Sequence, residues 1–324
     1  MNKKKAGYAL LAFILLVLLI SPYFLDGYLL TVLTNIMMTA LLAQSWNLLS
    51  GYAGQFSFGQ AAFFGIGAYT SVILYTVFEI SPWIGLLCGM LIAALVGAGI
   101  GYLSFHCKIK GDYFALATLA FAEIMRLLVY NSSGSVFGGP SGIFVKFIKG
   151  GDASAFQFDS WKPYYYIIFA FVAVVTLLLS MISKTRFGLQ LISVREDECA
   201  ADSLGVNILR YKISAIAISS AIAAAAGVFY AQYYLFIDPS AVFGSSISMQ
   251  AIIPCIIGGA GTPLGPVLGS FLIVPIQELT NSLFTEISGI NMIIYGLLIV
   301  VFILFCPNGI TGIVKNLKRK AAKK

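Results

Sequence analysis

The segment NLLSGYAGQFSFGQAAFFGIGAYTS (residues 47–71) interrupts an apolar part of the chain with glycines and polar side chains. Its first half holds three glycines, two glutamines and two serines within about a dozen positions. Backbone groups freed from a helix cost several kcal/mol each in lipid, so irregular backbone is tolerated at membrane depth only beside protein or water. The segment therefore requires an explanation if the surrounding chain lies in a membrane.

The composition places the chain in a membrane. Of its 324 residues, 59% are hydrophobic and only 10% are charged. A soluble domain carries about 25% charged residues because its surface must be wetted. Long continuous apolar runs favour helices over a β-barrel, whose strands would alternate. The predicted fold class is all-α, a polytopic integral membrane helical bundle that forms a single transmembrane domain over residues 1–324.

Eight apolar runs are long enough to cross a bilayer, which takes about 20 residues. They are residues 7–25, 29–49, 60–78, 83–105, 113–130, 163–183, 211–235 and 290–306. The first run is longer than the apolar region of a signal peptide, and no small-x-small cleavage site follows it. We therefore interpret it as a retained first helix.

A further apolar stretch, residues 246–281, is too long for one helix and is broken by GGAGTPLGP. As one span it gives nine crossings; as two short spans, 246–259 and 264–281, it gives ten. Most of the 20 basic residues precede the first run, follow the fourth, precede the seventh or end the chain. Because basic loops face the cytoplasm, this pattern favours about ten spans. Half-helices meeting inside the membrane fit the short pieces equally well.

Ten spans put both termini in the cytoplasm. The loop 131–162 then faces outward as a small cap, and the loop 184–210 faces the cytoplasm. The basic excess is thus a topology signal, so no nucleic-acid partner is expected.

The two breaks, GYAGQFSFGQ and GGAGTPLGP, occur one in each half of the chain. Paired interruptions at corresponding positions indicate a translocation path in transporters. The alternative is that the glycines serve only helix packing, as the spacings Gly97–Gly101 and Gly261–Gly265–Gly269 would allow. Neither break has the G-x-x-x-x-G-K-[ST] pattern of a phosphate loop, so the chain has no ATPase of its own.

Ionisable residues are scarce in the predicted spans. Glu123 and Arg126 lie on one helical face, and each charge costs about 2.5–3.5 kcal/mol to insert. They are expected to form a structural ion pair or to shape the outer vestibule. Few acidic groups in mid-span disfavour a secondary carrier driven by protons or sodium. No catalytic triad is visible, and five scattered cysteines with one histidine predict no metal site.

The loop SKTRFGLQLISVREDECAADSLGVNILRYK (residues 183–212) is too polar to insert. Acidic residues open the segment 195–205, which suits a helix N-terminus, and Gly205 supplies a stop. A short helix over 195–205 is predicted. It is either a docking site for another protein or a solvated connector.

The same loop resembles that of a known family. Ala200, Ala201 and Gly205 sit as in the E-A-A-x-x-x-G loop of bacterial ABC importer permeases, with Cys199 at the usual glutamate position and Glu198 one residue earlier. The segments SGYAGQFSFGQAAFFGIGAY, DYFALATLAFAEIMRLL, GGPSGI and GGAGTPLGPVLGS occur in the same order as in high-affinity branched-chain amino acid permeases of the M type. The resemblance covers essentially the whole chain.

This resemblance implies a non-catalytic permease subunit of a binding-protein-dependent ABC importer in the bacterial inner membrane. The implied partners are a homologous H-type permease, two cytoplasmic ABC ATPases and an extracytoplasmic substrate-binding protein. ATP is bound by the ATPases, and the chain itself is expected to hold no cofactor.

The resemblance also assigns roles to residues. The ATPase-coupling set would be Arg195, Glu196, Asp197, Glu198, Ala200, Ala201 and Gly205. The translocation path would be lined by Gly51, Gln55, Ser57, Gly59, Gln60, Gly258, Gly261 and Thr262.

The solute and two rival functions stay open. Leucine, isoleucine and valine are the first candidates for the transported solute, while urea, short amides and other small amino acids are alternatives. A self-sufficient secondary carrier or channel, and an enzyme acting on lipid-linked substrates, are the rival classes. Co-purification with an ATPase would separate the importer from both.

Overall fold

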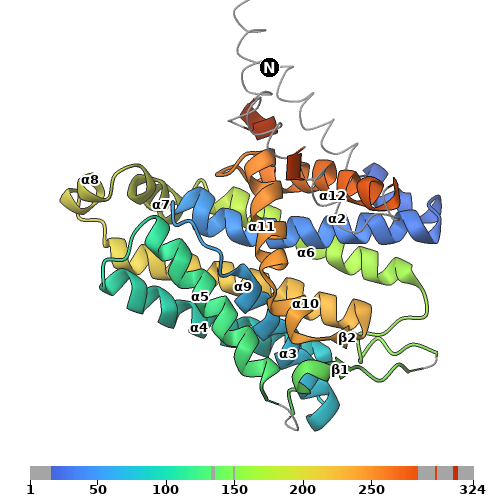
Figure 1. The fold of residues 1–324 in the computed structure, drawn as a ribbon. Helices are drawn as coiled ribbons and strands as arrows, with labels where there is room; N and C mark the ends of the chain where they lie inside the picture. The colour runs from blue at the N-terminus through green and yellow to red at the C-terminus, as the bar shows by residue number, and fades with distance from the viewer. Residues whose placement is uncertain (1–15, 133–135, 149, 284–295, 298–308, 313–324) are drawn as a thin grey trace, which may run out of the picture.

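The computed structural model describes residues 16–132, 136–148, 150–283, 296–297 and 309–312 (Figure 1). The regular elements of the described chain are helices, apart from one two-stranded pairing and an isolated bridge between Asp152 and Gln157. Its elements are η1 (Ser21–Tyr23), α2 (Gly27–Trp46), η2 (Asn47–Tyr52), α3 (Gln60–Phe78), α4 (Pro82–His106), α5 (Asp112–Tyr130), η3 (Gly139–Ser141), β1 (Ile143–Phe144), α6 (Trp161–Ile182), α7 (Arg186–Glu196), α8 (Glu198–Ser203), α9 (Ile208–Tyr234), β2 (Phe236–Ile237), α10 (Pro239–Phe243), α11 (Ser245–Gly258) and α12 (Gly265–Leu283).

The polytopic helical bundle predicted from the sequence is confirmed. Within the described residues, 7 helical segments are long and apolar enough to cross a membrane, and each matches a predicted span. The stretch 246–281 forms two helices, as the ten-span interpretation requires, although α12 is not one of the seven. Polar residues near its C-terminal end lower its hydropathy. The predicted span 290–306 and most of 7–25 lie outside the described residues.

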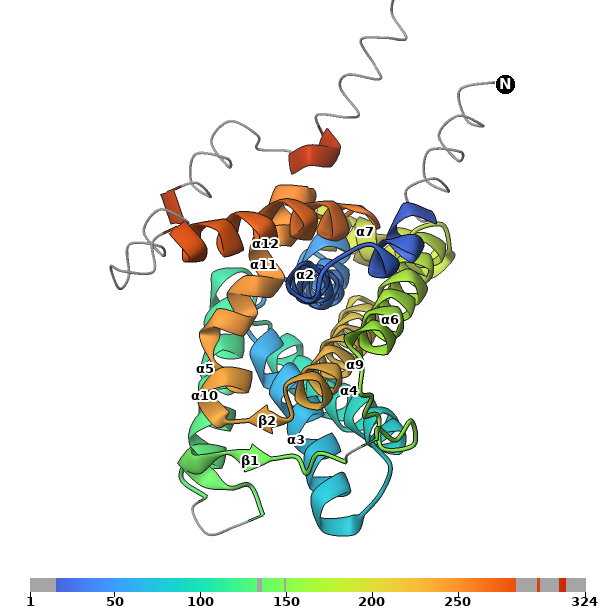
Figure 2. The same ribbon diagram turned by 90° about the vertical axis from the view of Figure 1, so that its right-hand side faces the viewer.

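Helix α2 lies in the centre of the bundle. In Figure 2 it is seen end-on between α6, α9, α11 and α12, and it packs against all four. Its residues are buried almost without interruption from Ile36 to Trp46. This buried part carries Thr39, Gln44 and Ser45, polar side chains that in a membrane protein face other protein groups in place of lipid. The end of α2 is therefore held by protein on every side.

Small residues bring the neighbouring helices close together. A Cβ on Gly97 of α4 would lie 2.2 Å from Ser220 Oγ of α9, and one on Gly101 would lie 2.6 Å from Ile216. On α12, a Cβ on Gly269 would lie 1.8 Å from the Pro254 carbonyl oxygen of α11. The predicted packing role of these glycines is confirmed, since small residues let helix backbones approach.

The two polar loops lie at opposite ends of the bundle (Figure 1). At one end the loop 131–162 contributes β1, which pairs antiparallel with β2 through Ile143–Ile237 and Phe144–Phe236. At the other end lie α7 and α8. The prediction of one helix over 195–205 is wrong, because α7 ends at Glu196 and α8 starts at Glu198.

Asp197 is the cause of that interruption. Its backbone is extended, with φ −157° and ψ 113°. Its side-chain Oδ1 accepts hydrogen bonds from the backbone N–H groups of Cys199 (2.8 Å) and Ala200 (3.0 Å). Aspartate is favoured as an N-cap because it satisfies these exposed donors. The residue therefore starts a second helix instead of continuing the first.

Candidate functional site

The two sequence breaks meet in space, although more than two hundred residues separate them. The first break is η2, a π-helix, followed by Gly54 with φ +69°. The second contains Gly259 and Gly261, with φ +114° and +78°. Asn47 bridges them: its Nδ2 donates to the Thr262 carbonyl (2.8 Å), and its Oδ1 accepts from the Gly261 N–H (2.7 Å).

We call this arrangement the joint and define it as Asn47, Gly51, Cys255, Gly261 and Thr262. The Asn47 side chain is fully buried, and the Cys255 thiol lies 3.5 Å from its Oδ1. A Cβ on Gly51 would lie 2.1 Å from Asn47 Oδ1 and 2.5 Å from the Gly261 nitrogen. Only glycine fits at residue 51 without moving the opposite backbone.

Arg195, at the end of α7, reaches into the joint. Its Nη1 donates to the Gly51 carbonyl (2.7 Å), and its Nε donates to the Glu196 carboxylate (3.1 Å). Gly54 and Gly261 make room for it, because a Cβ on either would lie within 3 Å of the Arg195 side chain. The structure thus brings a predicted coupling residue into contact with two predicted path residues, Gly51 and Gly261.

The other polar residues of the first break are held by protein in this conformation. Gln60 accepts from Ser45 Oγ and donates to Ser219 Oγ, both at 3.2 Å. The Ser57 carbonyl accepts from the Trp46 indole (2.8 Å), and Gln55 donates to the Ala53 carbonyl (3.2 Å). These bonds satisfy the polar groups that would otherwise be costly inside a membrane protein.

The two remaining glycines of the predicted path lie against neighbouring helices. Gly59 is buried beside Thr118 of α5, where a Cβ would lie 3.1 Å from the threonine Cβ. Gly258 is buried against α12, where a Cβ would lie 1.7 Å from the Gly265 carbonyl oxygen. Both therefore allow close helix contacts.

The rest of the coupling set divides into buried and exposed members. Glu198 forms ion pairs with Lys110 (2.7 Å) and with Lys212, whose side chain is 3% exposed. Burial raises the pKa of Glu198, but hydrogen bonds from the two lysines outweigh burial and hold the pKa below its ordinary value. Ala201 is buried with Val194 and Val206, which fastens α8 to α7.

Ala200 and Gly205, in contrast, lie on the surface of the α7–α8 segment. Gly205 has φ +80°, and a Cβ placed on it would meet no atom within 4 Å. This face is open for contact with another protein.

The predicted ion pair on α5 is present but lies apart from the joint. Arg126 Nε donates to Glu123 Oε2 (2.9 Å). The side chains are 26% and 51% exposed, respectively, so the pair lies on the surface of this chain. The pairing is confirmed, and its contribution to an outer vestibule stays a prediction.

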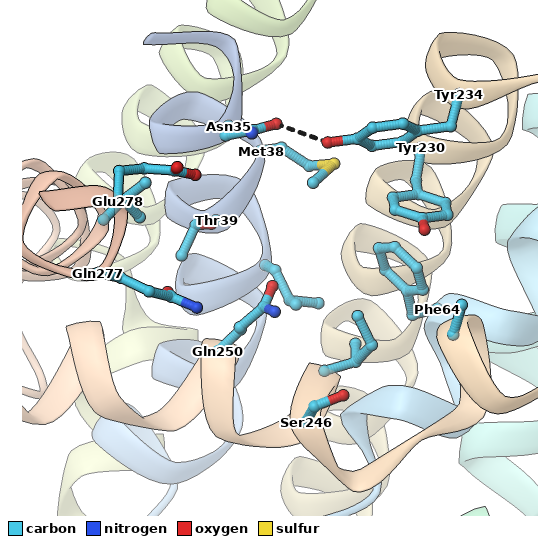
Figure 3. Close-up of a pocket in the computed structure, with 14 residues that line it drawn as sticks. Asn35, Met38, Thr39, Phe64, Tyr230, Tyr234, Ser246, Gln250, Gln277 and Glu278 are labelled. Atoms are coloured by element: carbon cyan, nitrogen blue, oxygen red, sulfur yellow. Dashed lines mark hydrogen bonds between the residues drawn. The ribbon is translucent and has the colours of Figure 1, made fainter. Parts of the chain in front are cut away.

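A cavity that the sequence analysis did not single out lies between α2, α3, α9, α11 and α12 (Figure 3). Its volume is about 220 Å³. None of the predicted path residues lines it. Its polar lining residues include Asn35, Gln250, Gln277 and Glu278. The sequence feature that could have indicated this cavity is the presence of these polar residues inside predicted spans.

The cavity lies close to the joint along α2. Leu42 lines the cavity, and Asn47 of the joint follows five residues later. At about 1.5 Å per helical residue, the two are separated by roughly 7.5 Å along the helix axis. The joint therefore lies just beyond one end of the cavity.

A polytopic helical bundle whose two breaks meet beside a cavity has the architecture of a membrane transport protein. The chain belongs to the family of branched-chain amino acid transport system permease components, whose family model matches residues 28–303. It is thus a multi-pass, non-catalytic permease component of an ABC transport system.

Named relatives include both types of permease. The chain is 31% identical to the high-affinity branched-chain amino acid permease protein LivM of Escherichia coli, over 95% of this chain and 77% of the relative. It is 24% identical to a probable LivM of Methanocaldococcus jannaschii, over 83% and 89%. It is 23% identical to the E. coli permease protein LivH, over 84% and 91%.

Proposed function

We propose that this chain forms half of the translocation path of a binding-protein-dependent importer for branched-chain amino acids. The names of its relatives support the solute class, and its similarity to both LivM and LivH supports pairing with a homologous H-type permease. The remaining partners are two cytoplasmic ABC ATPases, which bind the ATP, and an extracytoplasmic substrate-binding protein. The chain itself holds no cofactor in this proposal.

The proposed orientation follows from charge. The α7–α8 segment and its basic flanks face the cytoplasm, as do both termini, and the β1–β2 cap faces outward. The chain would lie in the bacterial inner membrane. The opposite placement of α8 and β1 in Figure 1 supports this arrangement.

The contact between Arg195 and Gly51 carries the proposed coupling mechanism. An ATPase docks on the exposed face of α8 around Ala200 and Gly205. ATP-driven closure then moves α7, and the Arg195 guanidinium leaves the Gly51 carbonyl. The joint separates, and the backbone groups of both breaks line a transient aqueous passage, where irregular backbone is tolerated.

Transport by Arg195 variants tests this mechanism. Arg195→Ala is expected to abolish ATP-driven leucine uptake in membrane vesicles that hold the partner subunits, while the ATPase still co-purifies. Arg195→Lys retains the charge but loses the forked geometry, so uptake is expected to fall strongly. Arg210→Ala, in the same loop, is the matched control. Normal uptake by Arg195→Ala would refute the coupling role, and uptake without ATPase partners would favour a secondary carrier.

A further inference from the structure

The cavity of Figure 3 has a size that suits a small solute. Its volume is about 220 Å³. Pockets for drug-sized ligands start near 300 Å³. The chemistry of the cavity walls narrows the class of solute.

One wall carries an unpaired negative charge. Glu278 of α12 is half-buried, and in the part of the chain that the structure describes it takes part in no ion pair. Among the described residues, no lysine or arginine lines the cavity. In Figure 3 the carboxylate points toward α2. A carboxylate that lines a cavity without a counter-ion attracts a cation that enters the cavity.

The neighbouring walls offer hydrogen-bond donors. Tyr234 donates its hydroxyl proton to Asn35 Oδ1 (3.0 Å), and the Asn35 amide nitrogen donates to no described residue. The side-chain amides of Gln250 and Gln277 likewise have no partner among the described residues. Amide N–H groups are suitable donors for a carboxylate.

The remaining wall is apolar. It is formed by Met38, Leu42, Phe64, Ile247 and Val274. These residues come from four helices, α2, α3, α11 and α12. A cation site, amide donors and an aliphatic wall together match a zwitterion that bears an aliphatic side chain.

We propose that this cavity binds one free amino acid with an aliphatic side chain inside this single subunit. Glu278 binds the ammonium group, Asn35 and Gln250 bind the carboxylate, and the apolar wall surrounds the side chain. The inference rests on the proposed function and deepens it, because it places solute recognition in the permease. Urea and short amides lack the ammonium group and would not use Glu278.

A cysteine placed in the cavity tests the proposal. Ser246 lines the cavity and is exposed, and serine-to-cysteine is nearly isosteric. The rate of thiol labelling of Ser246→Cys is measured in membranes that hold the full complex, with the parent rate subtracted because Cys107 and Cys199 are exposed. Leucine is expected to slow labelling several-fold. 3-Methylbutylamine should also protect, whereas 4-methylpentanoate, which lacks the ammonium group, should not.

Neutralising Glu278 supplies the decisive comparison. In Ser246→Cys with Glu278→Gln, protection by leucine and by the amine is expected to disappear. Glu79→Gln, an exposed glutamate at the end of α3, is the matched control and should retain protection. Protection that survives Glu278→Gln, or equal protection by 4-methylpentanoate, would overturn the proposal.

Transport measured in the same membranes separates the two hypotheses. ATP-driven leucine uptake without any protection of Ser246→Cys would refute the cavity site and leave the proposed function intact. Glu278-dependent protection without leucine uptake would support the site and refute the proposed transport function.

Discussion

Removal of the Asn47 side chain should open the joint, and the structure allows the size of the effect to be worked out. Asn47→Ala deletes the bonds to the Gly261 N–H and the Thr262 carbonyl. A buried polar group left without its partner costs about 1–3 kcal/mol. A water can enter the space that the side chain leaves, so the lower part of that range applies.

Two such groups place the loss at about 2–4 kcal/mol. Because about 1.4 kcal/mol is a factor of ten, the open form of the joint becomes roughly 30- to 700-fold more populated. This increase in the population of the open form should be measurable through the accessibility of a group that is exposed only in that form.

Cys255 is a native reporter of that opening. Its side chain is fully buried and lies beside Asn47. Its labelling rate, read by mass spectrometry of the peptide that contains it, tracks the population of the open joint when opening and closing are fast. Asn207→Ala is the control, since it removes the cap of α9 at a cost of about 1 kcal/mol without touching the joint. An unchanged Cys255 rate in Asn47→Ala would refute the assignment of Asn47 as the bridge.

Three further outcomes follow from the same contacts. Gly51→Ala should abolish uptake and expose Cys255, because its Cβ would lie 2.5 Å from the Gly261 nitrogen, whereas Gly99→Ala, which meets no atom within 4 Å, should transport normally. Glu198→Gln leaves the charged Lys212 buried without a counter-ion and should destabilise the protein by about 3–5 kcal/mol. Lys110→Met removes a side chain that is 58% exposed and should cost at most about 1 kcal/mol; thermal unfolding in detergent compares the two, and equal midpoints would contradict this assignment. Gly205→Arg should insert normally but lose ATPase co-purification and uptake, because its strain of about 1–2 kcal/mol is small and its side chain projects from the docking face; Gly111→Arg, at another open positive-φ glycine, is the control.

The sequence predicted the helices well, because membrane spans are specified by continuous apolar length. The predicted span 60–78 coincides with α3, and 113–130 differs from α5 by one residue. The interruption at Asp197 was missed, although an aspartate before a possible helix start is a capping signal. The acidic run REDE was read as one helix start, and its third residue is the cap itself.

The site was predicted only in part, for a physical reason. Composition marks where a helix is interrupted, so the two breaks that contain Gly51 and Gly261 were predicted. Which groups satisfy the unwound backbone depends on tertiary contacts, so the bridging role of Asn47 could not be seen. Glu278 lies in the polar end of α12, and the sequence alone does not show that this end faces a cavity.

The π-helical turn that begins at Asn47 has a mechanical consequence. In a π-helix each hydrogen bond joins residues i and i+5, so one turn contains more residues than a turn of α-helix. Such turns are frequent at functional sites. Rewinding η2 toward α geometry would exchange one hydrogen-bond register for another and rotate everything that follows it, including Gln55 and the start of α3. The end of α2 could therefore rotate by a change of hydrogen-bond register, without first losing its backbone hydrogen bonds.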